Sequence, residues 1–278
     1  MKSGVIKRFM KRKSSVAGAV ILIIFIITSV IGPFLCTKDP NEIDLENRYK
    51  PISKENLLGT DNLGRDTLTR LIYGARISML ISFIGVFTGA AAGVALGVCA
   101  GYFGGFTDMI ISRFIDILLA FPGLLLAIGV ISILGGGVVN TTLTIAFYSV
   151  PYVARLVRGV VLTLKNTEYV QACHVMGESS IRIILTHIIP NSMSIIIVDT
   201  TLSLGYAILT ASSLSFLGLG VTPPNPEWGA MLSQGREVMR SYPLAAIAPG
   251  LAITLVVLSF SLIGDGLRDA LDPKLKNC

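Results

Sequence analysis

The stretch KNTEYVQACHVMGESSIRIILTHIIPN, Lys165 to Asn191, is the longest polar interruption between apolar runs in the C-terminal half of the chain. Two groups of side chains in it follow the i, i+3, i+4, i+7 spacing of one helix face. They are Tyr169, Ala172, Cys173 and Met176, and then Ile181, Ile184, Leu185 and Ile188. The stretch is therefore expected to form two short helices joined at Gly177, and we call it the elbow.

Local signals set the limits of these two helices. Gly177 lies between them, where a chain reversal can require a positive φ. Ser179 can cap the second helix, because its hydroxyl can accept a hydrogen bond from a free backbone N–H. Pro190 is expected to end that helix, since proline disfavours helical backbone in the residue before it. Short helices with an apolar stripe need a surface to dock on, either their own membrane domain or a partner protein.

The composition is that of an integral membrane protein. Of 278 residues, 52% are hydrophobic and 14% are charged, whereas soluble domains average about 25% charged residues. Six positive charges precede Val16, which indicates a cytoplasmic N-terminus and argues against nucleic-acid binding. The four cysteines are widely scattered, so neither a disulfide framework nor a metal site is predicted. They are Cys36, Cys99, Cys173 and Cys278.

Six apolar runs have the length of membrane spans. They cover residues 16–35, 77–101, 109–134, 141–157, 191–216 and 244–263. The predicted fold class is all-α, a polytopic membrane protein of six transmembrane helices with cytoplasmic N- and C-termini and a cytoplasmic elbow. We expect residues 1–76 to hold the tail, the first span and an outer amphipathic segment. Residues 77–278 are expected to form a five-helix core that contains the elbow, residues 165–191.

Two polar segments are expected at the outer surface, residues 37–76 and 218–243. In the first, Asp66 can cap a helix. In the second, three prolines forbid a regular helix before Trp228, and this single tryptophan is expected to be an interfacial anchor.

Glycines recur every four residues in the second span, at Gly85, Gly89, Gly93 and Gly97. Such a row of small residues lets another helix backbone approach closely. The row predicts packing either within this chain or against a second membrane subunit.

Ionisable and polar residues inside the spans are candidates for a transport pathway. Asp199 and Ser203 lie in the fifth span, and Asp116 lies in the third, where it could instead pair with Arg113 on the same face. Pro122 is expected to kink that third helix.

Several motifs resemble the C-type permease subunits of the dipeptide, oligopeptide and nickel ABC importers. Gln171-Ala172-Cys173 followed by Gly177 is similar to the E-A-A-x-x-x-G loop of such permeases, with Gln for Glu and Cys for the second Ala. Glu168, three residues earlier, could supply the missing carboxylate contact. Three further blocks are typical of the same group. They are LLGTDNLGRDTLTRLIYGARIS at 57–78, SFLGLGVTPPNPEWGAM at 215–231 and GDGLRDALDP at 264–273.

The resemblance implies a non-enzymatic subunit in a bacterial or archaeal plasma membrane. In such permeases the elbow docks on the cytoplasmic ATPase and couples its movement to the membrane helices. The coupling residues here would be Glu168, Gln171, Ala172, Cys173, Gly177, Ile184 and Pro190. Its partners would be a second homologous permease in a heterodimer, two cytoplasmic ATPases, an extracellular substrate-binding protein and membrane lipid. The chain has no G-x-x-x-x-G-K-[ST] loop, so ATP and Mg²⁺ would be bound by the ATPases and this chain would hold no cofactor.

Alternatives remain at this point. The cargo implied by the resemblance is a di- or oligopeptide, with nickel or a metal chelate as the runner-up. An ion-coupled transporter acting alone would show internal repeats, and none is convincing. An intramembrane enzyme is disfavoured, because the only histidines are His174 and His187, both in the elbow.

Overall fold

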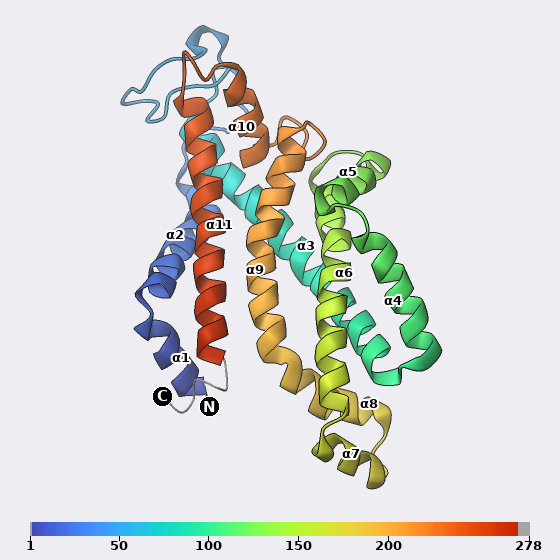
Figure 1. Ribbon diagram of the computed structural model, residues 1–278. Helices are drawn as coiled ribbons and strands as arrows, with labels where there is room; N and C mark the ends of the chain where they lie inside the picture. Colours follow the sequence, from blue (N-terminus) through green and yellow to red (C-terminus); the bar gives the residue numbers. More distant parts are fainter. Residues whose placement is uncertain (1, 272–278) are drawn as a thin grey trace.

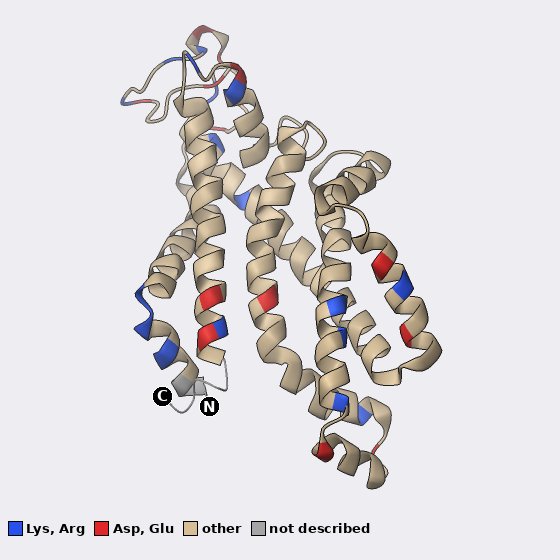
Figure 2. Ribbon diagram, in the orientation of Figure 1, with Lys and Arg blue, Asp and Glu red and all other residues tan. Residues whose placement is uncertain are grey.

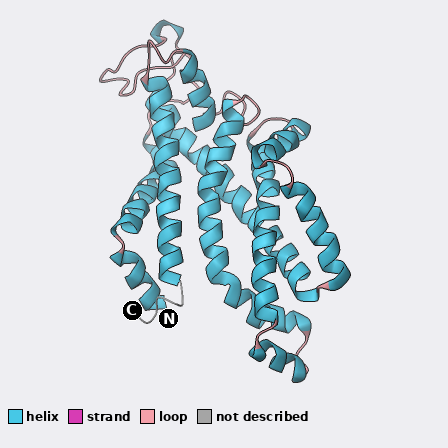
Figure 3. Ribbon diagram, in the orientation of Figure 1, coloured by secondary structure: helices cyan, strands magenta, loops and turns pink. Residues whose placement is uncertain are grey.

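The computed structural model describes residues 2–271, and every regular element within them is helical (Figures 1 and 3). The elements in chain order are α1 (Lys2–Lys11), α2 (Lys13–Leu35), the 3₁₀ turn η1 (Leu45–Asn47), α3 (Thr67–Phe103), α4 (Gly105–Leu119), α5 (Gly123–Leu134), α6 (Val138–Lys165), α7 (Glu168–Val175), α8 (Ser180–Ile183), the π-helix η2 (Ile184–Ile188), α9 (Ile189–Phe216), α10 (Trp228–Glu237) and α11 (Leu244–Leu271). The all-α fold class is thus confirmed. The end of the 264–273 motif and Cys278 lie outside the described residues.

Five helical segments are long and apolar enough to cross a membrane, namely α2, α3, α6, α8–η2–α9 and α11. The predicted third span is not one kinked helix. It is the pair α4 and α5, bent by 94°. Pro122 begins the second of them as its N-cap. Because proline lacks an N–H and disfavours helix in the preceding Phe121, the helix breaks there instead of bending.

The glycine row of α3 lies against α6 of the same chain. A Cβ built on Gly89 would be 2.4 Å from the carbonyl oxygen of Ala146, and one on Gly97 would be 2.6 Å from that of Ala154. Gly85 and Gly93 face Ile145 and Val153 in the same way. Only glycine permits this backbone approach, so the row binds α3 and α6 into one unit. The division anticipated at residue 76 falls inside α3.

Many charged residues lie at the two ends of the bundle, and others lie along α4 and α6 between them (Figure 2). At one end lie α1, the last turn of α11 and the elbow, α7 and α8 (Figure 1). Arg12 there forms an ion pair with Asp269 of α11. At the other end, Asp66 caps α3 as expected, and its Oδ2 accepts a hydrogen bond from the Thr69 N–H at 2.8 Å.

Trp228 is not an interfacial anchor, contrary to expectation. Its side chain is fully buried, with Phe25 of α2 packed edge-on at 5.7 Å. The neighbouring Glu227 is buried too, and its carboxylate accepts hydrogen bonds from Ser78, Ser212 and the Ala230 N–H. The segment before α10 therefore turns into the bundle, because the buried indole N–H and carboxylate both find partners there.

Candidate functional site

The elbow reverses the chain at Gly177, as predicted. Gly177 has φ +80°. Its N–H bonds the His174 carbonyl at 3.0 Å, and the next N–H, that of Glu178, bonds the Cys173 carbonyl at 3.1 Å. This pair of bonds is a Schellman motif, which satisfies the last carbonyls of α7 and needs a left-handed residue at the glycine. Ser179 is the N-cap residue of α8, but its side chain makes no capping hydrogen bond.

One face of the elbow packs on the bundle. Val170, Ile183 and Ile188 are fully buried and Cys173 nearly so, in one apolar cluster with residues of α3 and α6. The predicted stripe on the first helix was therefore only partly right. Tyr169, Ala172 and Met176 are exposed, because the buried face is centred on Val170 and Cys173.

The opposite face of the elbow is apolar and exposed. Val175 is 89% exposed, Met176 73% and Ile181 68%, and Leu185 lies on the same free surface. Glu168 and Gln171 are exposed as well, while Ile184 is half-buried. Several large apolar side chains exposed on one short element are typical of a docking site for another protein or a membrane.

Polar contacts join the elbow to the end of α3. The hydroxyl of Tyr102 lies 2.9 Å from Nε2 of His174, and Lys165 Nζ donates to the Tyr102 carbonyl at 2.6 Å. Tyr102 is itself buried. A force on α7 would therefore reach α3 directly as well as α6 and α9.

Pro190 does not end the second helix, which corrects the sequence prediction. The chain runs from α8 through the π-helical turn η2 into α9 without a break. Pro190 lies in the first turn of α9. A wider i→i+5 turn accommodates a residue that lacks an N–H and would crowd the carbonyl four residues earlier. The second half of the elbow and the fifth span are consequently one continuous helical segment, residues 180–216.

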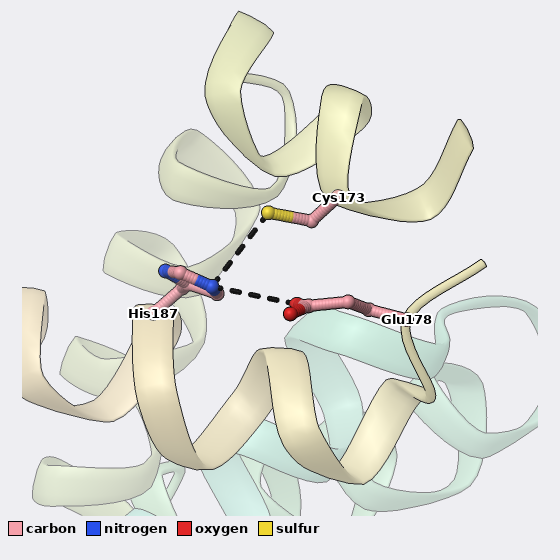
Figure 4. A group of neighbouring side chains, drawn as sticks. All are labelled: Cys173, Glu178 and His187. Atoms are coloured by element: carbon pink, nitrogen blue, oxygen red, sulfur yellow. Dashed lines mark hydrogen bonds and ion pairs between the residues drawn. The ribbon is translucent and has the colours of Figure 1, made fainter. Parts of the chain in front are cut away.

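Cys173, Glu178 and His187 converge inside the elbow (Figure 4). His187 Nε2 is 3.6 Å from Cys173 Sγ and 3.4 Å from Glu178 Oε2. Burial, followed by the nearby Glu178 carboxylate, raises the pKa of the Cys173 thiol. Neither Glu178 nor the pairing of Cys173 with His187 was predicted from the sequence. The i, i+14 spacing of Cys173 and His187 gives no local signal.

The predicted pathway residues do not form one group. Asp116 pairs with Arg155 of α6, not with Arg113 as expected, because α4 lies beside α6. The pair borders a cleft of about 300 Å³, whose lining also contains Ser112, Ile115 and Arg158. Asp199 and Ser203 lie one turn apart on α9, both half-buried, and Asp199 has no ion-pair partner within residues 2–271.

Comparison with known proteins gives two family matches. Residues 93–277 match the binding-protein-dependent transport system inner membrane component, and residues 3–51 match the N-terminal TM domain of oligopeptide transport permease C. The chain is 46% identical over 271 residues to the dipeptide transport system permease protein DppC of Alkalihalophilus pseudofirmus, covering 98% of this chain and 89% of that one. It is 44% identical over 272 residues to the glutathione transport system permease protein GsiD of Pectobacterium atrosepticum, covering 98% and 90%.

Solved structures show the same fold at low sequence identity. The inward-facing MetNI methionine ABC transporter matches with a TM-score of 0.62 at 16% identity, over 74% of this chain and 97% of that one. An amino acid ABC transporter with histidines matches with a TM-score of 0.56 at 15% identity, over 72% and 94%. Proteins of the matched family work with separate ATPase and substrate-binding proteins and are not enzymes themselves. This chain belongs to the binding-protein-dependent transport system inner membrane component family and is a multi-pass permease subunit of an ABC importer.

Proposed function

We propose that this permease imports di- or oligopeptides and that its elbow receives the force of a cytoplasmic ATPase. The relatives at 46% and 44% identity are named for a dipeptide and for glutathione, itself a small peptide. The single observation that carries the coupling role is the two-sided elbow. One face is buried against α3 and α6, and the other presents exposed Val175, Met176 and Ile181.

The complete transporter would contain a second homologous permease, two ATPases and a substrate-binding protein. ATP and Mg²⁺ would be held by the ATPases. Closure of the ATPase pair would move the docked elbow as a rigid body. Because α8, η2 and α9 are continuous, this movement would tilt α9 relative to its partners. The coupling set would comprise Glu168, Gln171, Ala172, Cys173, Gly177, Ile184 and Pro190.

The polar face of α9 is the best-supported part of a substrate pathway in this chain. Asp199 and Ser203 lie one turn apart and half-buried, as expected for groups completed by a second permease. Asp116 already forms an ion pair with Arg155, so its proposed role is to hold α4 against α6 beside the pathway. Asp199→Asn should alter peptide uptake while ATP hydrolysis by the assembled transporter persists. Unchanged uptake would contradict the assignment of Asp199.

Introducing a negative charge on the exposed face of the elbow tests the coupling role. Met176→Glu and Ile181→Glu replace exposed side chains, so the permease should fold and insert normally. Both should abolish co-purification of the ATPases and peptide uptake, because a buried unpaired carboxylate would disrupt the interface. The matched control is Ile52→Glu, an equally drastic change at an exposed position in the opposite end of the molecule, which should leave ATPase association intact. Normal ATPase association in both elbow variants would contradict the proposal.

The cargo requires a separate measurement. The cognate substrate-binding protein should retain peptides when purified, identifiable by mass spectrometry, and unlabelled peptides should compete with its uptake substrate. Retention of nickel or a metal chelate instead would redirect the assignment to metal import without changing the permease role.

A further inference from the structure

Three potential metal ligands from three different parts of the elbow meet at one point. Cys173 belongs to the last turn of α7, Glu178 to the reversal after Gly177, and His187 to the π-helical turn η2. Their ligand atoms all lie within 4.8 Å of one another. Figure 4 shows the thiol and the carboxylate approaching the same imidazole nitrogen from two sides.

The separations suit a tetrahedral metal ion. With Zn–S near 2.3 Å and Zn–N and Zn–O near 2.1 Å, tetrahedral angles put S···N at about 3.6 Å and N···O at about 3.4 Å. The structure has 3.6 Å from Cys173 Sγ to His187 Nε2 and 3.4 Å from His187 Nε2 to Glu178 Oε2. Two of the three separations thus already match those that a shared ion would impose, and the third, between the thiol and the carboxylate, is within 4.8 Å.

Hydrogen bonding alone leaves the cluster incomplete. His187 Nε2 can present one hydrogen at most, yet it faces both the thiol and the carboxylate. Glu178 Oε2 is buried and accepts no hydrogen bond within residues 2–271, although it lies 3.4 Å from His187 Nε2. The other carboxylate oxygen, Oε1, forms an ion pair with Arg182 at 3.6 Å. A buried carboxylate oxygen without a partner is costly, and such an oxygen needs a compensating group. A cation between the three ligands would satisfy all of them together.

The backbone around the cluster holds the ligands in place. The Schellman bonds at Gly177 fix Glu178 relative to Cys173. On the other side, the Tyr169 ring packs edge-on to His187 at 6.2 Å, and Asn191 Nδ2 donates to the His187 carbonyl at 2.6 Å. π-Helical turns often occur at functional sites, where they aim a side chain that a regular helix would turn away.

We propose that Cys173, Glu178 and His187 form a Zn²⁺ site within the elbow, with water as the fourth ligand. Thiolate and imidazole together favour zinc among the divalent metals, and a carboxylate is an accepted third ligand. The bound ion would join α7 to the start of α9 across the chain reversal. Metal binding rests on this geometry alone and does not depend on the docking role of the elbow. Sequence analysis predicted no metal site, because ligands 14 residues apart meet only after the elbow folds.

The test uses the full-length permease in detergent, purified through a tag without histidine and stripped with a chelator. Co²⁺ is titrated as a spectroscopic substitute for Zn²⁺. One Co²⁺ per chain should bind, with intense tetrahedral d–d bands and a thiolate-to-cobalt charge-transfer band, and Zn²⁺ should displace it. Cys173→Ser should abolish the charge-transfer band. Loss of a group that merely orients a ligand costs about 10–100-fold in metal affinity, so Glu178→Gln and His187→Gln should cost at least that.

Matched controls are present in the same chain. Cys99→Ser and His174→Gln remove one cysteine and one elbow histidine outside the cluster, and both should bind Co²⁺ like the wild type. If Cys173→Ser fails to fold, Glu178→Gln and His187→Gln decide the question, because both side chains are partly exposed, His187 by 31% and Glu178 by 24%. The proposal is overturned if stoichiometric Co²⁺ gives no thiolate band, or if the two latter variants keep wild-type affinity.

Discussion

The indole Nε1 of Trp228 donates a hydrogen bond to the backbone carbonyl oxygen of Leu71 at 3.0 Å. This bond ties α10 to α3 from within the bundle, and the edge of Phe25 adds a contact from α2. The segment around Trp228, expected at the membrane surface, is therefore part of the core. One side chain of α10 contacts both α2 and α3.

Removing that side chain should destabilise the permease strongly. Trp228→Ala should lower the free energy of unfolding by about 3–5 kcal/mol, the range for large aromatic truncations in cores. Trp228→Phe keeps most of the ring but loses the N–H donor, and it should cost less. Thermal unfolding of the purified protein in detergent measures both. Phe34→Ala is the control, because Phe34 is 80% exposed and should be near neutral. Equal effects of Trp228→Ala and Phe34→Ala would contradict the core role.

The buried carboxylate beside this tryptophan should make stability depend on pH. Burial raises the pKa of Glu227, against the opposing hydrogen bonds from backbone and serine groups. Above about pH 4.3, the ordinary pKa of a glutamate, the folded protein therefore binds more protons at this site than the unfolded chain. Its contribution to stability is fully present below that pH and is lost as the pH rises through the folded-state pKa.

Glu227→Gln isolates this effect. The limiting slope from one such group is about 1.4 kcal/mol per pH unit. The stability difference, wild type minus Glu227→Gln, should therefore fall as the pH rises from 4.3, and thermal unfolding across pH 4.5 to 8 measures it. Glu55→Gln, an exposed carboxylate in the outer segment, should show no such trend. A stability difference between wild type and Glu227→Gln that is independent of pH would show that Glu227 does not cause the pH dependence.

Predictions from the sequence succeeded where the cause was local. The Asp66 cap and the positive φ of Gly177 depend on a few neighbouring residues, and both were anticipated. The break at Pro122 was expected only as a kink, because its 94° angle is set by how α4 and α5 pack on α6. Pro190 was expected to end a helix, but the π-helical turn η2 just before it accommodates the proline and the helix continues.

Burial was harder to predict than helicity. Trp228 was expected at the membrane surface, yet its side chain is in the core. Met176 was expected on the apolar stripe of the first elbow helix, yet it is 73% exposed. Which face of a short helix is buried depends on the element opposite, here α3 and α6. The same limit concealed the meeting of Cys173 with His187, which no periodicity reveals. The two helices of the elbow and their reversal at Gly177 were thus predicted from the sequence, but which face of the elbow is buried was not.

The α3–α6 contact should be intolerant of any side chain at Gly89. A Cβ there would lie 2.4 Å from the Ala146 carbonyl oxygen and 2.8 Å from Ser149 Cβ. Gly89→Ala should destabilise the protein although alanine is the better helix former, because two backbones must separate. Gly129→Ala in α5 is the matched control, since a Cβ there meets nothing within 4 Å. It should be neutral or raise stability by about 0.5–1 kcal/mol. Thermal unfolding that ranks Gly89→Ala at or above Gly129→Ala would contradict the close contact.

Gly177 should be required for coupling through its backbone alone. Its φ is +80°, and a Cβ at this position would meet no atom within 4 Å, so a substitution acts only through conformational strain. A left-handed conformation costs an ordinary residue about 1–2 kcal/mol, and a β-branched residue is among the least tolerant. Gly177→Val should insert normally, lose ATPase association and abolish uptake. Gly177→Asn should retain most activity, because asparagine adopts this conformation readily.

Uptake assays, with membrane insertion checked by immunoblot, would distinguish Gly177→Val from Gly177→Asn. Equal loss of uptake in both variants would indicate that the ATPase contacts position 177 directly and leaves no room for a side chain. Normal uptake in Gly177→Val would refute the coupling role of the elbow.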